Sequence, residues 1–170
     1  MGMTAMPFTR PERAQCPVDF TGFDCGEQQI NDWLKHHANA SNKNGSAALY
    51  LSYDHETNEL AGVYTLSSTT VARDETYAPW MRRNSPILVP AALLGQLAVA
   101  NHFQHRGLAK ALIRDAVDRT LQLSLTIGIR ALVVDPLNSN LTMFYDSLGF
   151  EGFNGETRMH FRMPDYPRTL

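Results

Sequence analysis

Apolar residues recur along the chain with helical spacing in three places. This spacing predicts a helix over residues 26–39 and a second helix from residue 109 to about 121, whose apolar face is the most sharply separated from its charged face. A shorter apolar stripe predicts a third helix over residues 141–148, which Gly149 ends. The three predicted helices are therefore well separated, and the strands are expected in the segments between and after them.

Apolar runs without helical spacing predict the strands. Residues 47–53 and 60–68 form two such runs around a polar loop at 54–58, which is typical of a hairpin. A buried strand is predicted over 91–99. Residues 131–134 are a continuous apolar run, which favours a parallel strand buried on both faces.

Prolines and turn residues mark the remaining connections. Pro79, Pro86 and Pro90 predict an irregular or briefly helical segment over residues 73–90. A final hairpin is expected to turn at Asn154-Gly155 and to continue over 157–163. Together these elements predict an α/β (α+β) fold with a mixed, single-layer sheet and helices on its faces.

Length and composition set the domain organisation. A chain of 170 residues with 44% apolar and 19% charged residues is a folded protein with room for one full core. Residues 1–15 have no period and contain two prolines, so we expect a flexible N-terminal arm followed by a single domain over 16–170.

The cysteines and histidines bear on the cellular location of the protein and on metal binding. Cys16 and Cys25 are too few for a disulfide framework, which favours a reducing, cytoplasmic location. No apolar run is long enough for a spanning helix and no signal peptide is recognisable, so we expect no membrane association. The six histidines lack metal-ligand spacing, so no metal site is predicted.

The net charge of −2 hides an uneven distribution. Residues 76–114 contain no acidic residue and five basic ones, namely Arg82, Arg83, Arg106, Lys110 and Arg114. This segment is a candidate site for a polyanionic ligand, and a solvated basic face is the alternative.

The junction between the strand at 91–99 and the helix from 109 carries the clearest candidate chemistry. A loop with Gly107 at a helix start aims unpaired backbone N–H groups and the positive end of the helix dipole at one place, which suits an anion. An ordinary loop glycine is the alternative. The loop matches neither the dinucleotide nor the nucleoside-triphosphate glycine motif.

The loop sequence Q-H-R-G-L-A, followed downstream by F-Y-D-S-L-G-F, resembles the acyl-CoA loop and the last helix of the GNAT acetyltransferases. The resemblance implies a mostly antiparallel central sheet with helices on both faces, and acetyl-CoA as cosubstrate. It implies that the end of the preceding strand pairs with pantetheine, that the loop holds the pyrophosphate, and that an asparagine after the next strand contacts CoA. The residues so implied are Leu97, Ala98, Val99, Gln104, Arg106, Gly107, Leu108, Ala109 and Asn138, with Asn140 the alternative to Asn138.

Three further stretches, F-D-C-G-E-Q-Q-I-N-D-W-L-K-H-H-A, M-R-R-N-S-P-I-L-V-P and L-G-Q-L-A-V, resemble the GNAT toxins of type II toxin–antitoxin systems. That resemblance implies acetylation of the α-amine of aminoacyl-tRNA, a block of translation, a ribbon-helix-helix antitoxin and a homodimer. A small-molecule amine or a protein N-terminus is the alternative acceptor. A module that binds CoA without turnover is a further alternative.

The chemistry of acetyl transfer can be assigned to few residues. The resemblance implies that Tyr145 is the general acid, since a phenol with a pKa of about 10 is protonated at pH 7 and can protonate a departing thiolate; a core aromatic is the alternative. The backbone N–H near Val99 is a candidate oxyanion donor. The strand carries no carboxylate to act as a base, which favours an α-amine with a pKa of about 8 over a lysine. Arg82 and Arg83, with Arg73, are candidate tRNA phosphate contacts.

Overall fold

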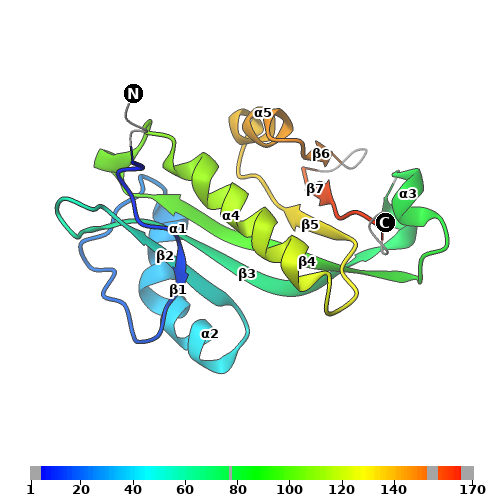
Figure 1. The fold of residues 1–170 in the computed structure, drawn as a ribbon, viewed down its shortest axis with the longest axis horizontal. Coiled ribbons are helices and arrows are strands. Elements are labelled where there is room, and N and C mark those ends of the chain that lie inside the picture. The colour runs from blue at the N-terminus through cyan, green and yellow to red at the C-terminus, as the bar shows by residue number, and fades with distance from the viewer. Residues whose placement is uncertain (1–4, 77, 153–156, 166–170) are drawn as a thin grey trace. The chain divides into compact units, whose positions relative to one another are not determined.

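The computed structural model describes residues 5–76, 78–152 and 157–165, so the hairpin turn predicted at Asn154-Gly155 lies outside the described residues. Hydrogen bonding orders the strands β1-β2-β3-β4-β5-β7-β6 (Figure 1). The chain divides into two compact units, Met1–Leu66 with Gln96–Asp115, and Ser67–Gly95 with Ala116–Leu170. Strands β3 and β4 and helix α4 run from one unit into the other.

The first unit contains the N-terminal elements and the start of α4. Its elements are β1 (Glu12–Arg13), α1 (Gln28–Trp33), a π-helical turn (Leu34–Ala38), α2 (Asn39–Asn44), β2 (Ala48–Tyr53), a 3₁₀ turn (Asn101–Phe103) and parts of β3 (Leu60–Ala72), β4 (Leu88–Val99) and α4 (Leu108–Leu123). The helix predicted over 26–39 is thus continuous in direction but longer, and it ends at Gly45, whose φ of +82° is left-handed.

The N-terminal segment differs from the flexible arm expected over residues 1–15. Phe8 is buried and bridges Asp54, and the Thr9 N–H donates to the Tyr53 carbonyl at 2.8 Å. Glu12 and Arg13 pair with β2 as strand β1. The physical reason is that β2 offers an unpaired edge, and backbone pairing with an edge needs no side-chain periodicity.

Helices cover both faces of the sheet in the first unit. Val63 of β3 packs in a core with Ile30 and Leu34 of the N-terminal helices, which Figure 1 shows beside β2 and β3. Its neighbour Gly62 points to the opposite face, where a Cβ would lie only 2.9 Å from Leu108 and from Leu112 of α4. Glycine at this position therefore lets α4 approach the strand closely.

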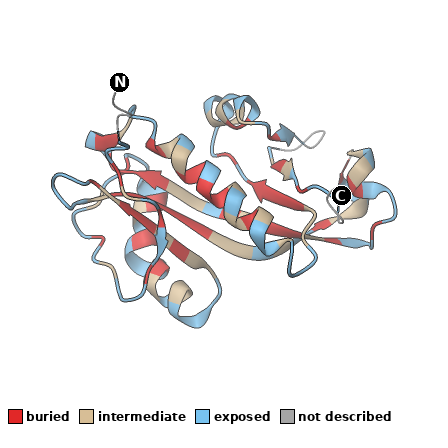
Figure 2. Ribbon diagram, viewed as in Figure 1, coloured by how far each residue is buried: buried red, intermediate tan, exposed pale blue. Residues whose placement is uncertain are grey.

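The second unit is built around β5. It contains a 3₁₀ turn (Arg73–Glu75), α3 (Pro79–Arg82), β5 (Ala131–Val134), α5 (Ser139–Ser147), β6 (Glu151–Gly152) and β7 (Met159–Arg162), with the remaining parts of β3, β4 and α4. Strand β5 pairs parallel with β4 and antiparallel with β7, and all four of its residues are buried (Figure 2). This confirms the parallel strand predicted from the apolar run.

The fold class is confirmed as mixed α/β (α+β), and among the described pairings only β4 with β5 is parallel. Two strands are longer than predicted, because β3 continues to Ala72 and β4 already begins at Leu88. Pro90 lies inside β4, where its carbonyl still accepts a hydrogen bond from the Arg130 N–H at 2.9 Å. Within the described residues, no helix is long and apolar enough to span a bilayer.

Candidate functional site

The C-terminal end of β4 extends past its parallel partner. Pairing with β5 runs from Ala91 to Leu94, and β4 continues to Val99. Leu97 is half-buried and Ala98 and Val99 are buried. The next N–H, that of Ala100, donates to the Ala61 carbonyl at 2.8 Å, which keeps the strand end attached to β3.

The loop after β4 turns sharply into α4. His105 and Gly107 both have left-handed φ angles, +62° and +84°. Nothing lies within 4 Å of the place where a Gly107 Cβ would stand, so the space in front of the helix start is open. Leu108 is buried and anchors the first turn, while Arg106 is exposed with its guanidinium carbon 5.7 Å from the Phe103 ring centre. The first N–H groups of a helix have no partner within the helix, so an open position at Gly107 is compatible with an anion at this helix start.

Gln104 does not point into that open space. Its Nε2 donates to the Cys25 carbonyl and to the Val99 carbonyl, both at 2.9 Å, with Asn101 Oδ1 at 3.3 Å. A glutamine amide nitrogen carries two hydrogens, so its donors are already engaged. The side-chain amide nitrogen of Gln104, predicted as a CoA ligand, thus forms hydrogen bonds within the protein and joins the Cys25 turn to the end of β4.

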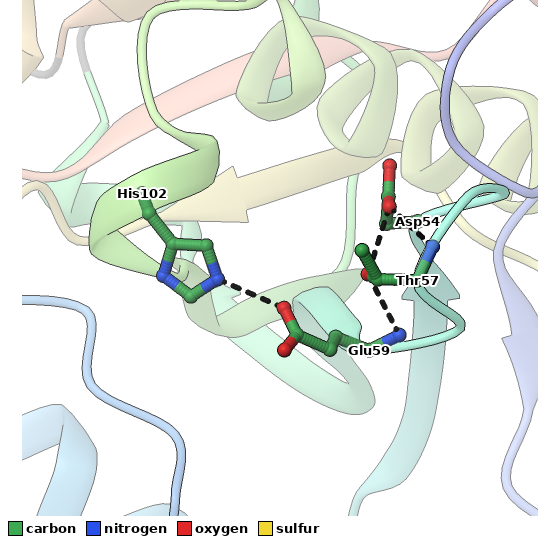
Figure 3. A network of polar contacts seen from close by, with 4 residues as sticks. All are labelled: Asp54, Thr57, Glu59 and His102. Atoms are coloured by element: carbon green, nitrogen blue, oxygen red, sulfur yellow. Dashed lines mark hydrogen bonds and ion pairs between the residues drawn. The ribbon is translucent and has the colours of Figure 1, made fainter.

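The turn before the loop is attached to the β2–β3 connection. His102 Nε2 lies 3.1 Å from Glu59 Oε2, and Figure 3 shows the imidazole directed at that carboxylate. In the same connection Asp54 Oδ2 accepts from the Thr57 N–H at 2.9 Å and from its hydroxyl at 2.8 Å (Figure 3). These two bonds lower the pKa of Asp54, which therefore stays ionised as the turn's acceptor.

Tyr145 lies in the second unit, on α5. Its side chain is 3% exposed and packs edge-on against Phe150, with ring centres 5.3 Å apart. Burial raises the pKa of the phenol, so the hydroxyl is protonated at neutral pH. The ring is thus a core aromatic, and the role of its hydroxyl as general acid stays a prediction.

Asn138 and the arginines are also in the second unit. Asn138 caps α5, because its Oδ1 accepts from the Leu141 N–H at 3.1 Å, which occupies the side-chain oxygen of this predicted CoA contact. Arg82 and Arg83 are exposed. Arg73 is partly engaged, since its Nη1 donates to the Ser85 carbonyl at 3.2 Å.

Arg130 is a residue of this region that sequence reasoning missed. Its Nη2 donates to the Trp80 carbonyl at 2.7 Å, and its Nη1 contacts Ser85 Oγ and the Arg83 carbonyl, the latter at 3.4 Å. It therefore holds the segment that carries Arg82 and Arg83. The only available signal was an arginine directly before the apolar run of β5, and that position is not specific.

Neither cysteine nor histidine forms a metal centre in the part of the chain that the structure describes, where no group of three His, Cys, Asp or Glu residues is close enough to hold an ion. Cys16 is exposed and Cys25 is buried, and both are free thiols. Burial raises the pKa of Cys25, which favours the unreactive thiol.

Comparison with known proteins shows which family and which solved structures this chain is similar to. Residues 17–150 match the acetyltransferase (GNAT) family. The chain is 35% identical over 145 residues, 85% of each chain, to the tRNA-acetylating toxin of Mycobacterium tuberculosis (strain ATCC 25618 / H37Rv). Its fold is similar to that of AtaT complexed with acetyl-methionyl-tRNAfMet, with a TM-score of 0.82 and 27% identity over 91% of this chain and 94% of that one. It is also similar to a mutant AtaT bound to the C-terminus of the antitoxin AtaR and acetyl-CoA, with a TM-score of 0.75 and 28% identity over 91% and 92% of the two chains.

Proposed function

This chain belongs to the acetyltransferase (GNAT) family, and from that premise we propose that it transfers the acetyl group of acetyl-CoA to the α-amine of aminoacyl-tRNA and thereby blocks translation. The observation that carries the acceptor is the 35% identity to a tRNA-acetylating toxin over 85% of both chains. The open position at Gly107, immediately before α4, supports acetyl-CoA as the donor.

The cosubstrate is assigned to the first unit. The pyrophosphate lies on the N–H groups at Gly107, Leu108 and Ala109, and the exposed Arg106 supplies charge. Pantetheine follows the backbone of Leu97, Ala98 and Val99. The family resemblance also implies a CoA contact from Asn138, whose side-chain oxygen accepts one hydrogen bond, from the Leu141 N–H.

The transfer step needs few groups. The neutral α-amine attacks the thioester carbonyl, a C–N bond forms, and the C–S bond breaks. The N–H near Val99 donates to the developing oxyanion, and Tyr145 gives its proton to the departing thiolate. The proton that the amine nitrogen loses as the amide forms restores the phenol of Tyr145. No carboxylate stands on β4, and an α-amine with a pKa of about 8 is neutral often enough to react without one.

The RNA and protein partners follow from the same assignment. The exposed Arg82 and Arg83 contact tRNA phosphates, and Arg73 is a further contact. Residues 16–170, with β1 added to their sheet, act as one acetyltransferase domain in the cytoplasm, where charged tRNA is found. An antitoxin of the ribbon-helix-helix class neutralises the enzyme, and the enzyme is a homodimer.

The direct test is acetylation in vitro. The purified protein is incubated with radiolabelled acetyl-CoA and with charged tRNA, uncharged tRNA, a lysine-containing peptide or a polyamine. We expect label only on charged tRNA, released with the amino acid by mild base, and growth arrest when the protein is expressed without its antitoxin. Label on the peptide or the polyamine, with none on charged tRNA, would refute the proposed acceptor.

A further inference from the structure

We propose that the turn at residues 24–26, capped by Asn31, positions the loop that receives the CoA pyrophosphate, with Gln104 as the link between them rather than a CoA ligand. This inference rests on the proposed function. It assigns a role to the stretch F-D-C-G-E-Q-Q-I-N, which stands about 75 residues before the loop in the sequence and which the catalytic assignment leaves unused.

The first link is the peptide group between Asp24 and Cys25. Its carbonyl, that of Asp24, accepts from the Asn101 N–H at 2.9 Å, at the start of the turn that precedes the loop. Its N–H, that of Cys25, donates to Asn31 Oδ1 at 3.0 Å. One peptide group is thus held from the helix side by Asn31 and presents its oxygen to the loop side.

The second link is the next peptide group, between Cys25 and Gly26. Its carbonyl, that of Cys25, accepts from Gln104 Nε2 at 2.9 Å. Its N–H, that of Gly26, donates to Asp24 Oδ1 at 2.8 Å, and the same oxygen accepts from Asn31 Nδ2 at 2.8 Å. Two successive peptide groups therefore have the same arrangement, and hydrogen bonds at the two ends of a peptide group polarise each other.

The charge state of Asp24 fits this arrangement. The hydrogen bonds from the Gly26 N–H and from the Asn31 side chain lower the pKa of Asp24, so its carboxylate remains an acceptor at neutral pH. Gly26 itself has a left-handed φ of +88°, and a Cβ there would lie 3.0 Å from Asn101 Oδ1. The left-handed φ favours glycine at this position, and a Cβ would also press on the Asn101 side-chain oxygen.

Gln104 connects the turn at residues 24–26 to the proposed acetyl-CoA site. Its second hydrogen bond, to the Val99 carbonyl at 2.9 Å, joins the end of β4 to the start of the loop. The strand end proposed for pantetheine and the loop proposed for pyrophosphate are therefore fixed to each other by one side chain. Since the site consists of backbone N–H groups, fixing the backbone fixes the ligand geometry.

The matched experiment compares two asparagines of the first unit. Asn39 makes two hydrogen bonds to the Val18 backbone, both at 2.8 Å, and has no part in the turn at 24–26. We expect Asn31→Ala and Asn39→Ala to lower the melting temperature by similar amounts. Only Asn31→Ala should weaken acetyl-CoA binding, by about three- to tenfold, and it should raise KM for acetyl-CoA with little change in kcat.

A double substitution separates positioning from direct contact. If Asn31 and Gln104 act through this arrangement, the double substitution Asn31→Ala with Gln104→Ala should weaken acetyl-CoA binding by less than the product of the two single effects, since only the contact from Asn101 to the Asp24 carbonyl remains for Asn31 to act through. Multiplicative effects would mean that Gln104 and Asn31 act independently, and would overturn the proposal. Asn31→Asp keeps the volume and the acceptor but cannot donate to Asp24, so it should shift the affinity in the same direction if the alanine variant folds poorly.

Calorimetry on the wild-type protein comes first. If wild-type protein does not bind acetyl-CoA, the proposed function fails and this inference with it. If the wild-type protein binds and Asn31→Ala and Asn31→Asp bind equally well, the positioning role alone is refuted.

Discussion

The loop of the first unit and the arginine-bearing segment of the second unit are held by different kinds of side chain. Neutral Gln104 donates to the carbonyls of Cys25 and Val99, whereas cationic Arg130 donates to the carbonyls of Trp80 and Arg83. Arg130 reaches its segment from a distant part of the sequence, whereas Gln104 belongs to the loop and binds one distant carbonyl, that of Cys25, and one nearby carbonyl, that of Val99.

The difference reflects what each segment presents. The loop presents backbone N–H groups, so its geometry must be exact and a neutral tie is sufficient. The second segment presents the long side chains of Arg82 and Arg83, which adapt to a phosphate by themselves. In the second segment Arg130 is a permanent cation and adds to the local positive charge. The guanidinium carbons of Arg130 and Arg162 lie 5.8 and 4.9 Å from the centre of the Trp80 ring, within the range of cation–π contacts.

The largest effect is expected at the loop itself. Gly107→Glu places a negative charge in the open space before α4, and acetyl-CoA binding should fall below detection in calorimetry. Gly107→Ala is the control, because it imposes the same left-handed strain at φ +84° without charge and meets no atom within 4 Å. If the glutamate variant folds and binds like the wild type, the pyrophosphate lies elsewhere.

The next effect separates turnover from binding. Tyr145→Phe removes one hydroxyl from a ring that is already packed against Phe150, so the melting temperature and the acetyl-CoA affinity should hardly change. Acetylation of charged tRNA should fall by about 10²-fold or more, as for loss of a general acid. The expressed variant should no longer be toxic. A folded variant that acetylates at the wild-type rate would leave Tyr145 only its role in the core.

The exposed arginines should act on tRNA alone. Arg82→Ala with Arg83→Ala should raise KM for charged tRNA several-fold and should make log KM less steeply dependent on log salt, by about 0.7 to 0.9 for each phosphate that the variant no longer neutralises. The acetyl-CoA affinity measured on the same protein should stay unchanged. An unaltered salt dependence would place the tRNA-binding surface on other residues.

Substitutions of Arg130 test whether this residue positions the segment that carries Arg82 and Arg83. Arg130→Lys keeps the charge but cannot reach several carbonyls at once, so it should lower the melting temperature by a few degrees, close to the effect of Arg130→Met. Both should weaken tRNA binding less than the double substitution of Arg82 and Arg83. If lysine fully restores stability and tRNA binding, the charge of Arg130 matters and its hydrogen-bond geometry does not.

The smallest effect is a pH dependence in the second unit. Burial lowers the pKa of His160, and the Glu151 carboxylate opposes that shift. The unfolded chain therefore takes up a proton at higher pH than the folded one, so stability is full above about pH 6.5 and declines as the pH falls below it. His160→Phe should flatten the melting temperature between pH 7 and 5, and Glu151→Gln should steepen it. Identical pH profiles for all three proteins would contradict this account.

Several features could be predicted from sequence because their signals are local. The helix predicted from residue 109 is observed as Leu108–Leu123, and the apolar run at 131–134 is β5. Helical and strand periodicity depend on neighbours within a few residues, which the sequence displays directly. The loop before α4 is recognisable for the same reason, since a strand, a glycine and a helix start are adjacent in the chain.

Only the tertiary structure decided the direction of side chains and the extent of pairing. Gln104 lies in the predicted motif, yet its bond to Cys25 spans 79 positions, and Arg130 reaches Trp80 across 50. The two-residue strand β1 exists only because β2 offers it an edge. Backbone carbonyls are present at every residue and leave no mark in the sequence, so which of them a side chain will bind is settled only when packing brings distant segments together.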